Sequence, residues 1–441
     1  MPTAARRQLI AIIGVLFLAG CDIWFGLEDA PPLPGERLSV LSHQNTLVPD
    51  PELADAEILL PAPFANPDWP QPGGYANHAM HHVEVGAALA TLWREDIGEG
   101  ADDTERLVGS PVVADGRVFA MDAESRVSAH DAETGKRLWR KDLTPDEDDD
   151  GHIGGGLAFE AGRVFATTGF AQVVALNAGT GEELWRRTLD GPMRTAPTVR
   201  GGRVFAVTVV NKLYALRADT GETLWDHTGI EETASLLGGA SPAVDEGIVI
   251  APFTSGELVA LSVESGRELW SDSLTAIRRT DVVSTLSHIR GRPIIDRGRV
   301  FAISHGGLMA AIDLRSGQRV WDKDLGGQES PWVAGDYLFV LTNNAELVCL
   351  SRDNGRVFWV RQLPRFEDEE DQKDPITWTG PILASDRLIV AGSHGEALAV
   401  SPYTGRVIGR QELPDSVSVS PVVAAGTLYL LANDATLVAL R

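Results

Sequence analysis

One eleven-residue segment recurs along the chain and constrains its fold more than any other feature. It runs from a small residue through a glycine to a tryptophan, and it reads AHDAETGKRLW in the copy that ends at Trp139. Further copies end at Trp185, Trp225, Trp270, Trp321, Trp359 and, with the tryptophan replaced, Gly409. A shorter stretch, GRVFA, stands upstream of four of them, starting at Gly116, Gly162, Gly202 and Gly298. Consecutive tryptophans are 38 to 51 residues apart, and a period of this length indicates a solenoid or a propeller.

The residues around these segments predict four short β-strands in each repeat. In the first repeat, short apolar stretches cover Pro111–Val113, Val118–Met121, Val127–His130 and Arg137–Lys141, and alternation with a period of two is typical of strands. A small residue followed by proline opens several repeats, at Ser110-Pro111, Ala196-Pro197, Ser241-Pro242, Ser330-Pro331 and Ser420-Pro421. Four antiparallel strands per repeat predict one propeller blade.

The recurrent residues of the turn suit a packing role. Gly135 can adopt the positive φ that a tight turn requires, and the side chains of Asp131 and Asn177 can bond to nearby backbone groups. A tryptophan ring covers a large area of a neighbouring blade, and a small residue such as Ala175 leaves space for it. We therefore expect a structural role between blades, not a catalytic one, for Trp93, Trp139, Trp185, Trp225, Trp270, Trp321 and Trp359.

The two ends of the chain determine the number of blades. Seven turns lie between Trp139 and Gly409, and an isolated strand-like segment, GAALATLWRED, carries Trp93. Three more strand-like segments follow the last turn, and the strand of Trp93 can complete their blade, which leaves no open sheet edge. The sequence thus predicts an all-β, eight-bladed propeller over residues 86–441, with four-stranded antiparallel blades and a ring closed by an N-terminal strand.

The N-terminus has the pattern of a bacterial lipoprotein signal. Arg6 and Arg7 precede an apolar run too short for a comfortable membrane span, and the run ends in Leu-Ala-Gly before Cys21. Residues 1–21 are predicted to be a signal peptide with a lipobox, with Cys21 as the lipid anchor; an ordinary signal peptide or a membrane anchor is the alternative. Residues 22–85 are rich in proline and predict a tether, although their apolar segment ILLPAPF could pack along the domain instead.

Charge and cysteine content exclude several classes of function. The net charge of −24 argues against nucleic acid as a partner and against unaided binding to anionic lipid. The two cysteines, Cys21 and Cys349, are too few for a disulfide framework or a four-cysteine zinc site. We expect no cofactor.

Three clusters contain metal-ligating residue types, and we expect no metal site at any of them. His78, His81 and His82 lie close in sequence but have no cysteine or acid nearby to complete a zinc site. The acidic runs Asp146–Gly151 and Glu367–Asp371 fall between repeats and are expected to be solvated loops rather than calcium sites. No serine, histidine and acid stand in an order that indicates a catalytic site.

The turn A-x-D-A-x-T-G-x-x-x-W resembles the repeat of the pyrroloquinoline-quinone propellers, and the resemblance covers nearly all of residues 86–441. One branch of that superfamily contains quinone-dependent dehydrogenases, which would make this chain a periplasmic enzyme. The adjacent cysteines of those enzymes, and their calcium beside a catalytic aspartate, have no counterpart here. The other branch is the BamB family, lipoproteins of the outer-membrane β-barrel assembly (BAM) machinery, which are similar in lipobox, length and closure by an N-terminal strand.

Similarity to the BamB family implies a non-enzymatic scaffold on the periplasmic face of the outer membrane. Its implied partners are the periplasmic domains of BamA, other BAM subunits and unfolded outer-membrane proteins. Enterobacterial members contact BamA through a Leu-Arg-Gly and an Asp-x-Asp segment, which align here with SLLGGASP, at Leu236 and Leu237, and with LSHIRGRP, at His288 and Arg290. The hydrophobic anchor is kept and the charges are not, so either the partner has changed to match or the contact has shifted. Alternatively, both leucines belong to the core.

Asp22 leaves the choice of membrane open. In enteric bacteria an aspartate directly after the lipidated cysteine tends to keep lipoproteins in the inner membrane, and Asp22 has that position. The outer membrane is the expected location, and an inner-membrane propeller with other partners is the alternative.

Overall fold

The computed structural model describes residues 47–102, 104–146, 152–232, 236–275 and 287–441. Residues Leu47–Arg441 form one compact unit. In the described part of this unit there is one short 3-10 helix, η1 (Pro51–Leu53), and the other regular elements are strands. The described residues include no helix that is long and apolar enough to cross a membrane.

Eight four-stranded antiparallel sheets form the blades, numbered here along the chain. Blades 1 to 4 are β2 (Val112–Ala114), β3 (Arg117–Met121), β4 (Arg126–Asp131) and β5 (Arg137–Asp142); β6 (Gly156–Glu160), β7 (Arg163–Thr167), β8 (Gln172–Asn177) and β9 (Glu183–Thr188); β10 (Thr198–Arg200), β11 (Arg203–Val207), β12 (Lys212–Arg217) and β13 (Thr223–Thr228); and β14 (Ala243–Asp245), β15 (Ile248–Pro252), β16 (Glu257–Ser262) and β17 (Glu268–Ser273). Blades 5 to 7 are β18 (Ile294–Asp296), β19 (Arg299–Ile303), β20 (Leu308–Asp313) and β21 (Arg319–Asp324); β22 (Trp332–Ala334), β23 (Tyr337–Leu341), β24 (Glu346–Ser351) and β25 (Val357–Gln362); and β28 (Trp378–Ala384), β29 (Arg387–Gly392), β30 (Glu396–Val400) and β31 (Val407–Glu412). Blade 8 is β32 (Val422–Ala424), β33 (Thr427–Leu431), β34 (Thr436–Leu440) and β1 (Thr91–Asp96), and a two-stranded hairpin, β26 (Phe366–Asp368) and β27 (Lys373–Pro375), precedes blade 7.

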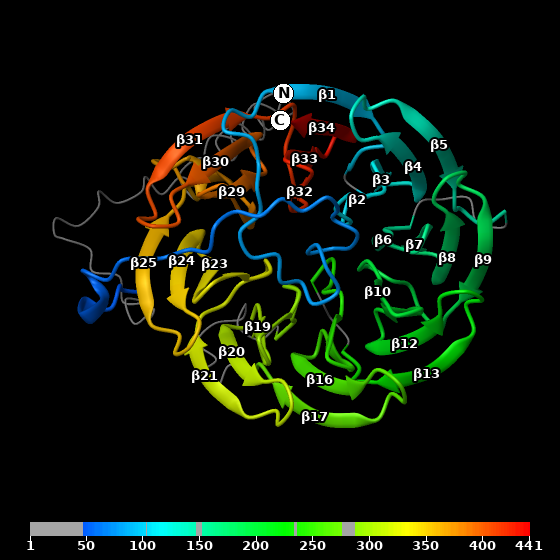
Figure 1. Cartoon of the computed structure of the whole chain (residues 1–441), viewed down its shortest axis with the longest axis horizontal. Helices are drawn as coiled ribbons and strands as arrows, with labels where there is room; N and C mark the ends of the chain where they lie inside the picture. Colours follow the sequence, from blue (N-terminus) through cyan, green and yellow to red (C-terminus); the bar gives the residue numbers. More distant parts are fainter. Residues whose placement is uncertain (1–46, 103, 147–151, 233–235, 276–286) are drawn as a thin grey trace, which may run out of the picture. The chain divides into compact units, whose positions relative to one another are not determined.

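The sheets stand in a ring, with the first strand of each blade nearest the centre and the fourth at the rim (Figure 1). The predicted closure is confirmed, because β1 pairs with β34 from Thr91↔Leu440 to Asp96↔Thr436. The first and last strands of the propeller, β1 and β34, therefore pair in blade 8, and each of the eight blades has four strands.

The middle strands differ from the outer ones in their apolar pattern. The second and third strands are buried on both faces, as in β11 and β12, whereas an outermost strand such as β5 alternates between exposed and half-buried residues. Each blade is covered by a neighbour on both sides, so its middle strands need apolar residues on both faces. The GRVFA stretch is the second strand, and it repeats because each blade is packed in the same way.

Each repeat tryptophan lies against the turn of the next blade. The indole Nε1 of Trp139 donates a 3.0 Å hydrogen bond to the carbonyl oxygen of Ala178, and a Cβ on Gly181 would lie 2.6 Å from the same indole ring. The equivalent indole hydrogen bonds run from Trp93, Trp185, Trp225, Trp270, Trp321 and Trp359 to the carbonyl oxygens of Ala132, Ala218, Val263, Leu314, Arg352 and Pro402. The ring therefore requires glycine at the turn, and the hydrogen bond sets its position.

Blade 7 has Gly409 in place of this tryptophan, and the structure explains the exception. The next blade has its third and fourth strands from opposite ends of the chain, β34 and β1, so no turn joins them. An indole at position 409 would have no turn glycine to cover. Arg387 bonds instead to the carbonyl oxygens of Gly86 and Ala87 at this junction.

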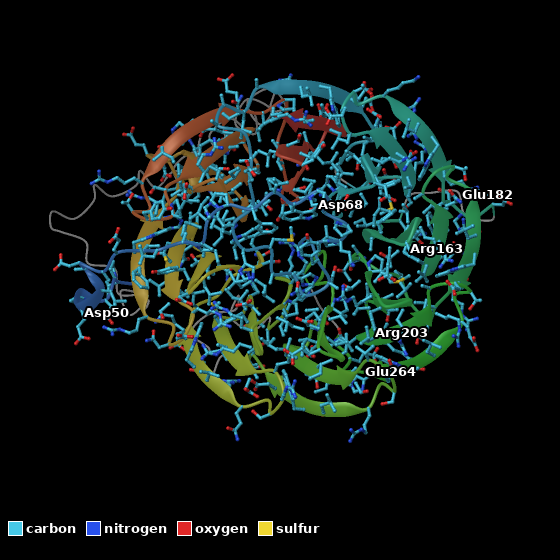
Figure 2. All side chains as sticks on the ribbon, in the orientation of Figure 1. Asp50, Asp68, Arg163, Glu182, Arg203 and Glu264 are labelled. Carbon is cyan, nitrogen blue, oxygen red and sulfur yellow. The ribbon has the colours of Figure 1, made fainter. Side chains whose placement is uncertain are left out.

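The arginine of GRVFA also links neighbouring blades. Arg203 pairs with Glu264 at 2.5 Å (Figure 2). Arg163 pairs with Asp219. In both pairs the acid lies in the turn between the third and fourth strands of the next blade. Arg299 pairs in the same way with Asp353, at 2.6 Å. The acids are exposed and the arginines are half-buried, so solvent weakens each pair and each contributes little to stability.

The N-terminal segment differs from the predicted tether. Residues 66–85, which we call the belt, run around the central channel and bond to the innermost strand of every blade. In blade order from 8 through 1 to 7, the contacts are Asn66–Val423, Trp69–Val113, Pro70–Phe159, Gln71–Val199, Ala76–Val244, Asn77–Ile295, His81–Trp332 and Val83–Leu383. The innermost strands have one edge without a strand partner, and the belt satisfies part of that edge.

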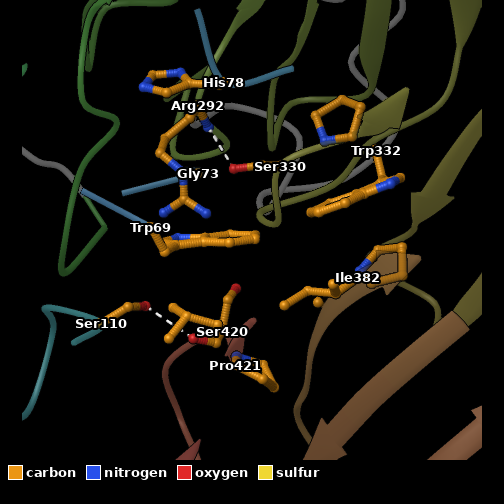
Figure 3. A pocket seen from close by; sticks show the side chains of 14 residues that line it. Trp69, Gly73, His78, Ser110, Arg292, Ser330, Trp332, Ile382, Ser420 and Pro421 are labelled. Atoms are coloured by element: carbon orange, nitrogen blue, oxygen red, sulfur yellow. Dashed lines mark hydrogen bonds between the residues drawn. The ribbon is translucent and has the colours of Figure 1, made fainter. Parts of the chain in front are cut away.

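The belt also fills the channel. Trp69 is 2% exposed and stacks on Trp332 with 6.1 Å between ring centroids, and the guanidinium of Arg292 lies over the Trp69 ring (Figure 3). The boundary predicted between residues 85 and 86 is therefore not a boundary of the compact unit, which begins at Leu47. Ile58, in the ILLPAPF segment, is 5% exposed, so packing along the domain is the better description there.

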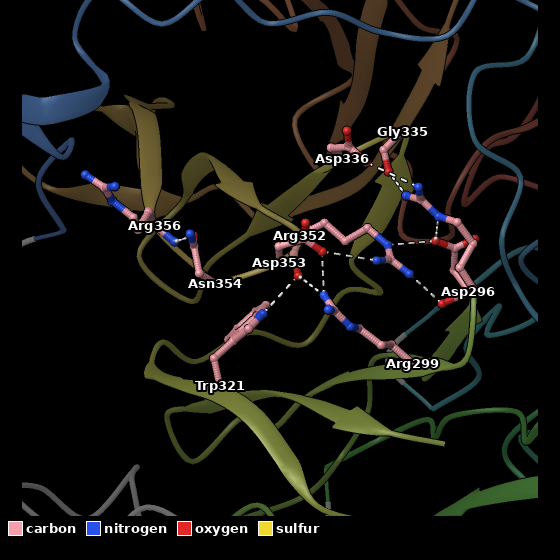
Figure 4. Close-up of polar contacts among 10 residues, drawn as sticks. Asp296, Arg299, Trp321, Gly335, Asp336, Arg352, Asp353, Asn354 and Arg356 are labelled. Atoms are coloured by element: carbon pink, nitrogen blue, oxygen red, sulfur yellow. Dashed lines mark hydrogen bonds and ion pairs between the residues drawn. The ribbon is translucent and has the colours of Figure 1, made fainter. Parts of the chain in front are cut away.

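A buried ion pair joins blades 5 and 6 beside the belt. Arg352 Nε lies 2.9 Å from Asp296 Oδ2, and the two side chains are 6% and 5% exposed (Figure 4). Arg297 Nε is 3.1 Å from the same oxygen, and His81 Nε2 of the belt is 3.4 Å from Asp296 Oδ1. Asp296 thus connects two blades and the belt, and its charge is compensated on more than one side.

Candidate partner-binding face

The two segments predicted to contact a partner lie side by side. Residues 236–239, which we call the contact loop, precede β14, and residues 287–290 precede β18, the innermost strand of the next blade. The backbone N–H of Leu236 donates a 3.1 Å hydrogen bond to His288 Nδ1, and Arg290 Nε–H donates a 3.1 Å hydrogen bond to the Leu237 carbonyl oxygen. Because every blade has the same strand direction, both segments belong to one face of the ring.

The contact loop presents one leucine to solvent. Leu237 is 38% exposed, whereas Leu236 is half-buried. The core alternative therefore does not describe Leu237. Gly238, which follows it, has a φ of +87°, and a Cβ there would lie 3.3 Å from Arg290 Nε. Glycine thus allows the turn and the close approach of Arg290.

His288 is a buried hydrogen-bond partner of the contact loop. Its side chain is 1% exposed, and burial, together with the nearby charge of Arg290, lowers its pKa to about 4. Since Nδ1 accepts the Leu236 N–H, the neutral ring carries its proton on Nε2. A neutral, buried imidazole presents no charge at the surface, so what the structure shows for His288 is that it holds the loop.

Arg290 is only partly exposed and already has an ionic partner. Its side chain is 27% exposed, and Nη1 lies 3.1 Å from Glu329 Oε1 in the loop before β22. Glu329 Oε2 in turn accepts hydrogen bonds from Thr379 Oγ1 at 3.0 Å and from Ser420 Oγ at 3.3 Å. A cleft of about 130 Å³ borders the Arg290–Glu329 pair and is lined in part by Trp378.

Sequence reasoning missed Glu329, although the sequence contains a signal for it. The residue before the small-residue-proline pair is Gly109, Thr195, Ala240, Thr379 and Val419 in the other repeats where that pair is found, and it is Glu329 before Ser330-Pro331. A single acid at a position that otherwise has small or apolar residues near a channel indicates a specific partner for its charge. That partner, Arg290, could not be identified without the fold.

The described part of the channel does not fit a quinone. The space among Trp69, Arg292 and Trp332 is about 20 Å³, room for about one water molecule, and a tricyclic quinone is many times larger. Its walls are packed side chains, with Trp69 and Trp332 stacked on each other. The residues present thus do not form a cradle for pyrroloquinoline quinone in this channel.

The histidine cluster separates in the fold. The ring Nδ1 atoms of His78 and His82 bond to the carbonyl oxygens of Pro293 and Pro61, both at 2.7 Å, whereas His81 faces Asp296. Among the residues that the structure describes, no three histidine, cysteine or acidic side chains are grouped to hold a metal ion.

The two acidic runs are expected to be solvated loops, and Cys21 is predicted to be the lipid anchor. Glu367–Asp371 lies in the hairpin of β26 and β27 and is exposed. Of the run Asp146–Gly151 only Asp146 is described, and Cys21 and Asp22 lie outside the described residues.

The sequence matches the family model described as outer membrane protein assembly factor BamB, over residues 90–150, 123–361 and 366–441. Curated relatives with that name include the proteins of Shigella dysenteriae, 28% identical over 46% of this chain and 50% of the relative, and of Alkalilimnicola ehrlichii, 29% identical over 47% and 52%. The Escherichia coli relative is 27% identical over 46% of this chain and 50% of the length of that relative. The chain thus spans about half the length of the curated relatives it matches.

Solved structures share the fold. The crystal structure of BamB from Moraxella catarrhalis matches with a TM-score of 0.68 at 18% identity, covering 80% of this chain and 99% of that one. The quinohemoprotein alcohol dehydrogenase of Comamonas testosteroni matches with a TM-score of 0.64 at 15% identity, over 85% of this chain and 80% of that one. The fold is common to both branches, and the family model separates them: the chain belongs to the family of the outer membrane protein assembly factor BamB.

Proposed function

We propose that this chain is a non-enzymatic lipoprotein scaffold of the outer-membrane β-barrel assembly machinery. It binds the periplasmic domains of BamA through the contact loop and, with other BAM subunits, aids the folding and insertion of unfolded outer-membrane proteins. Cys21 carries the lipid that anchors it to the periplasmic face of the outer membrane. The family membership supports the role, and the exposure of Leu237 is the observation that supports the site.

The exposed leucine fits an interface anchor. Leu237 is 38% exposed, and covering it with a partner would lower the free energy of the complex, because apolar surface leaves water. The small residues beside it, Gly238 and Gly239, let a partner approach closely. The loop backbone is held by His288 and Arg290, so little conformational entropy is lost when a partner binds. Exposed apolar surface on a loop whose backbone is already held in place suits a contact with a partner.

A quinone-dependent dehydrogenase is the other function that the repeat implies. It shares the fold, but the channel space of about 20 Å³ offers no room for the cofactor. Titration of the purified chain with pyrroloquinoline quinone, followed by absorbance, tests this directly. We expect no spectral change, and saturable binding at one equivalent would favour the enzyme.

Binding of purified BamA periplasmic domains to the detergent-solubilised full chain tests the scaffold. Leu237→Asp is expected to weaken binding by at least about tenfold, as for a central interface residue. Leu269→Asp is the matched control, because Leu269 is 39% exposed but lies in β17 at the rim; it is expected to bind like the wild type.

Two results would contradict the proposal. If wild-type chain does not bind the BamA domains, and membranes solubilised gently yield the chain with inner-membrane or electron-transfer proteins, the scaffold role is wrong. If Leu237→Asp and Leu269→Asp bind equally well, the role stands and the contact lies elsewhere.

A further inference from the structure

We propose that Glu329 is a positioning residue for the contact loop, two blades away, and that it acts through Arg290. This inference rests on the proposed function of the contact loop and names a residue that controls it. Glu329 lies before blade 6, Arg290 before blade 5 and Leu237 before blade 4. Together they form a polar connection between three neighbouring blades on the face that carries the loop.

The first step is the connection from the loop to the acid. Arg290 uses two different nitrogens: Nε–H donates to the Leu237 carbonyl oxygen at 3.1 Å, and Nη1 lies 3.1 Å from Glu329 Oε1. A guanidinium is planar and rigid, so fixing one nitrogen fixes the direction of the other. The orientation of the Leu237 backbone therefore depends on where Glu329 holds the guanidinium.

The second step is the fixation of Glu329 itself. Its other carboxylate oxygen accepts hydrogen bonds from Thr379 Oγ1 at 3.0 Å and Ser420 Oγ at 3.3 Å, and the Gly380 N–H lies at 3.4 Å. Glu329 is 14% exposed. Four donors from three different blades thus hold one half-buried carboxylate, and such a group has little freedom to move.

The third step separates positioning from general stability. Without Glu329, Arg290 loses its ion pair and becomes free to leave the Leu237 carbonyl oxygen, so the contact loop loosens. Thr379, Gly380 and Ser420 also lose an acceptor, but the hydrogen bonds between the strands of the blades stay intact. The loss is therefore expected at Leu236–Gly239 and in partner binding, and not throughout the propeller.

A double-mutant cycle on the full chain tests whether Glu329 acts through Arg290. Glu329→Ala and Arg290→Ala are each expected to weaken binding of the BamA periplasmic domains by about fivefold, a moderate interface effect. The double variant is expected to bind no worse than Arg290→Ala alone, because residues of one network are not additive. Glu329→Gln, which keeps an oxygen acceptor for Arg290, should restore part of the binding. Fully additive losses, or wild-type binding by Glu329→Ala, would overturn the inference.

Hydrogen–deuterium exchange gives a readout that does not need the partner. In Glu329→Ala the amides of residues 236–239 are expected to exchange at least about fivefold faster, with the middle strands of the blades unchanged. Glu183→Ala is the control, because Glu183 also pairs with an arginine, Arg186 at 2.8 Å, but in the outermost strand β9. If the wild type fails to bind the BamA domains, the proposed BamA contact is wrong, and exchange still decides the positioning: faster exchange confined to the loop supports it, and uniform or unchanged exchange overturns it.

Discussion

The indole Nε1 of Trp93 donates a 3.0 Å hydrogen bond to the carbonyl oxygen of Ala132, so the first strand of the propeller is locked to the turn of blade 1. Trp93 is 8% exposed and lies in β1, which completes blade 8. This contact and the β1–β34 ladder close the ring between the two ends of the chain.

Trp93→Ala is expected to lower the free energy of unfolding by about 3–5 kcal/mol, the usual cost of truncating a buried aromatic residue. Leu92→Ala is the control, because Leu92 is the adjacent residue of β1 and is 41% exposed; its effect should stay within about 0.5 kcal/mol. Urea unfolding followed by circular dichroism measures both. Equal midpoints for the two variants would mean that the indole contributes nothing to closure.

Substitutions at two glycines of blade 3 distinguish the cost of a positive φ from the cost of displacing a tryptophan ring. Gly202 and Gly221 have φ of +74° and +71°, but a Cβ on Gly202 meets nothing within 4 Å, whereas one on Gly221 lies 2.6 Å from the Trp185 ring. Gly202→Ala is expected to cost about 1 kcal/mol from the positive φ alone, and Gly221→Ala about 3 kcal/mol because the indole is displaced as well. Thermal unfolding of the pair checks the difference, and equal losses would exclude a packing role for the ring.

The propeller could be predicted because its constraints are local and repeated. The glycine, the tryptophan and the apolar strand pack each blade against the next one, and the same contact is made again around the ring. Even the exception was visible, since Gly409 precedes the blade whose last turn is missing. The contact loop was located by alignment to a family pattern, and the structure brings Leu237 and Arg290 together.

The belt could not be predicted in the same way. Its residues have no period, because each of them meets a different blade and must follow the curvature of the channel. Proline and glycine in this stretch are equally typical of a tether. The burial of His288 and the pairing of Arg290 with Glu329 likewise depend on neighbours that are distant in sequence.

The belt is expected to contribute to the stability of the whole ring. A variant that starts at Leu47 should unfold at the same temperature as the full chain, whereas one that starts at Gly86 should unfold at a much lower temperature. The second variant leaves groups of the innermost strand in all eight blades without their belt partners: backbone groups in seven blades, and the indole Nε1 of Trp332 in blade 6.

Gln71→Ala tests the same point if the shorter variant does not fold. The Gln71 side chain donates to the Val199 carbonyl oxygen at 2.6 Å and accepts the Val199 N–H at 2.9 Å, so its removal should cost about 2 kcal/mol. Wild-type stability of both variants would show that the belt is only a tether.

Acid is expected to destabilise the protein between about pH 6.5 and pH 4. Burial, aided by a neighbouring arginine, lowers the pKa of His78 to about 3 and that of His288 to about 4. An unfolded histidine has a pKa of about 6.5, so below that pH the unfolded chain binds protons that the folded chain does not. The stabilisation is therefore complete above pH 6.5, and each histidine removes up to about 1.4 kcal/mol for every pH unit of descent until its folded pKa is reached.

His288→Asn separates this effect from the titration of acids. Asparagine keeps an acceptor for the Leu236 N–H but does not titrate, so the slope of unfolding free energy between pH 6.5 and 4.5 should fall by about 1.4 kcal/mol per unit. Carboxylates with lowered pKa values, such as Asp131 and Asp313, titrate below this window. Urea midpoints measured at half-unit steps give both slopes, and identical slopes for variant and wild type would mean that His288 is protonated in the folded chain as readily as in the unfolded one.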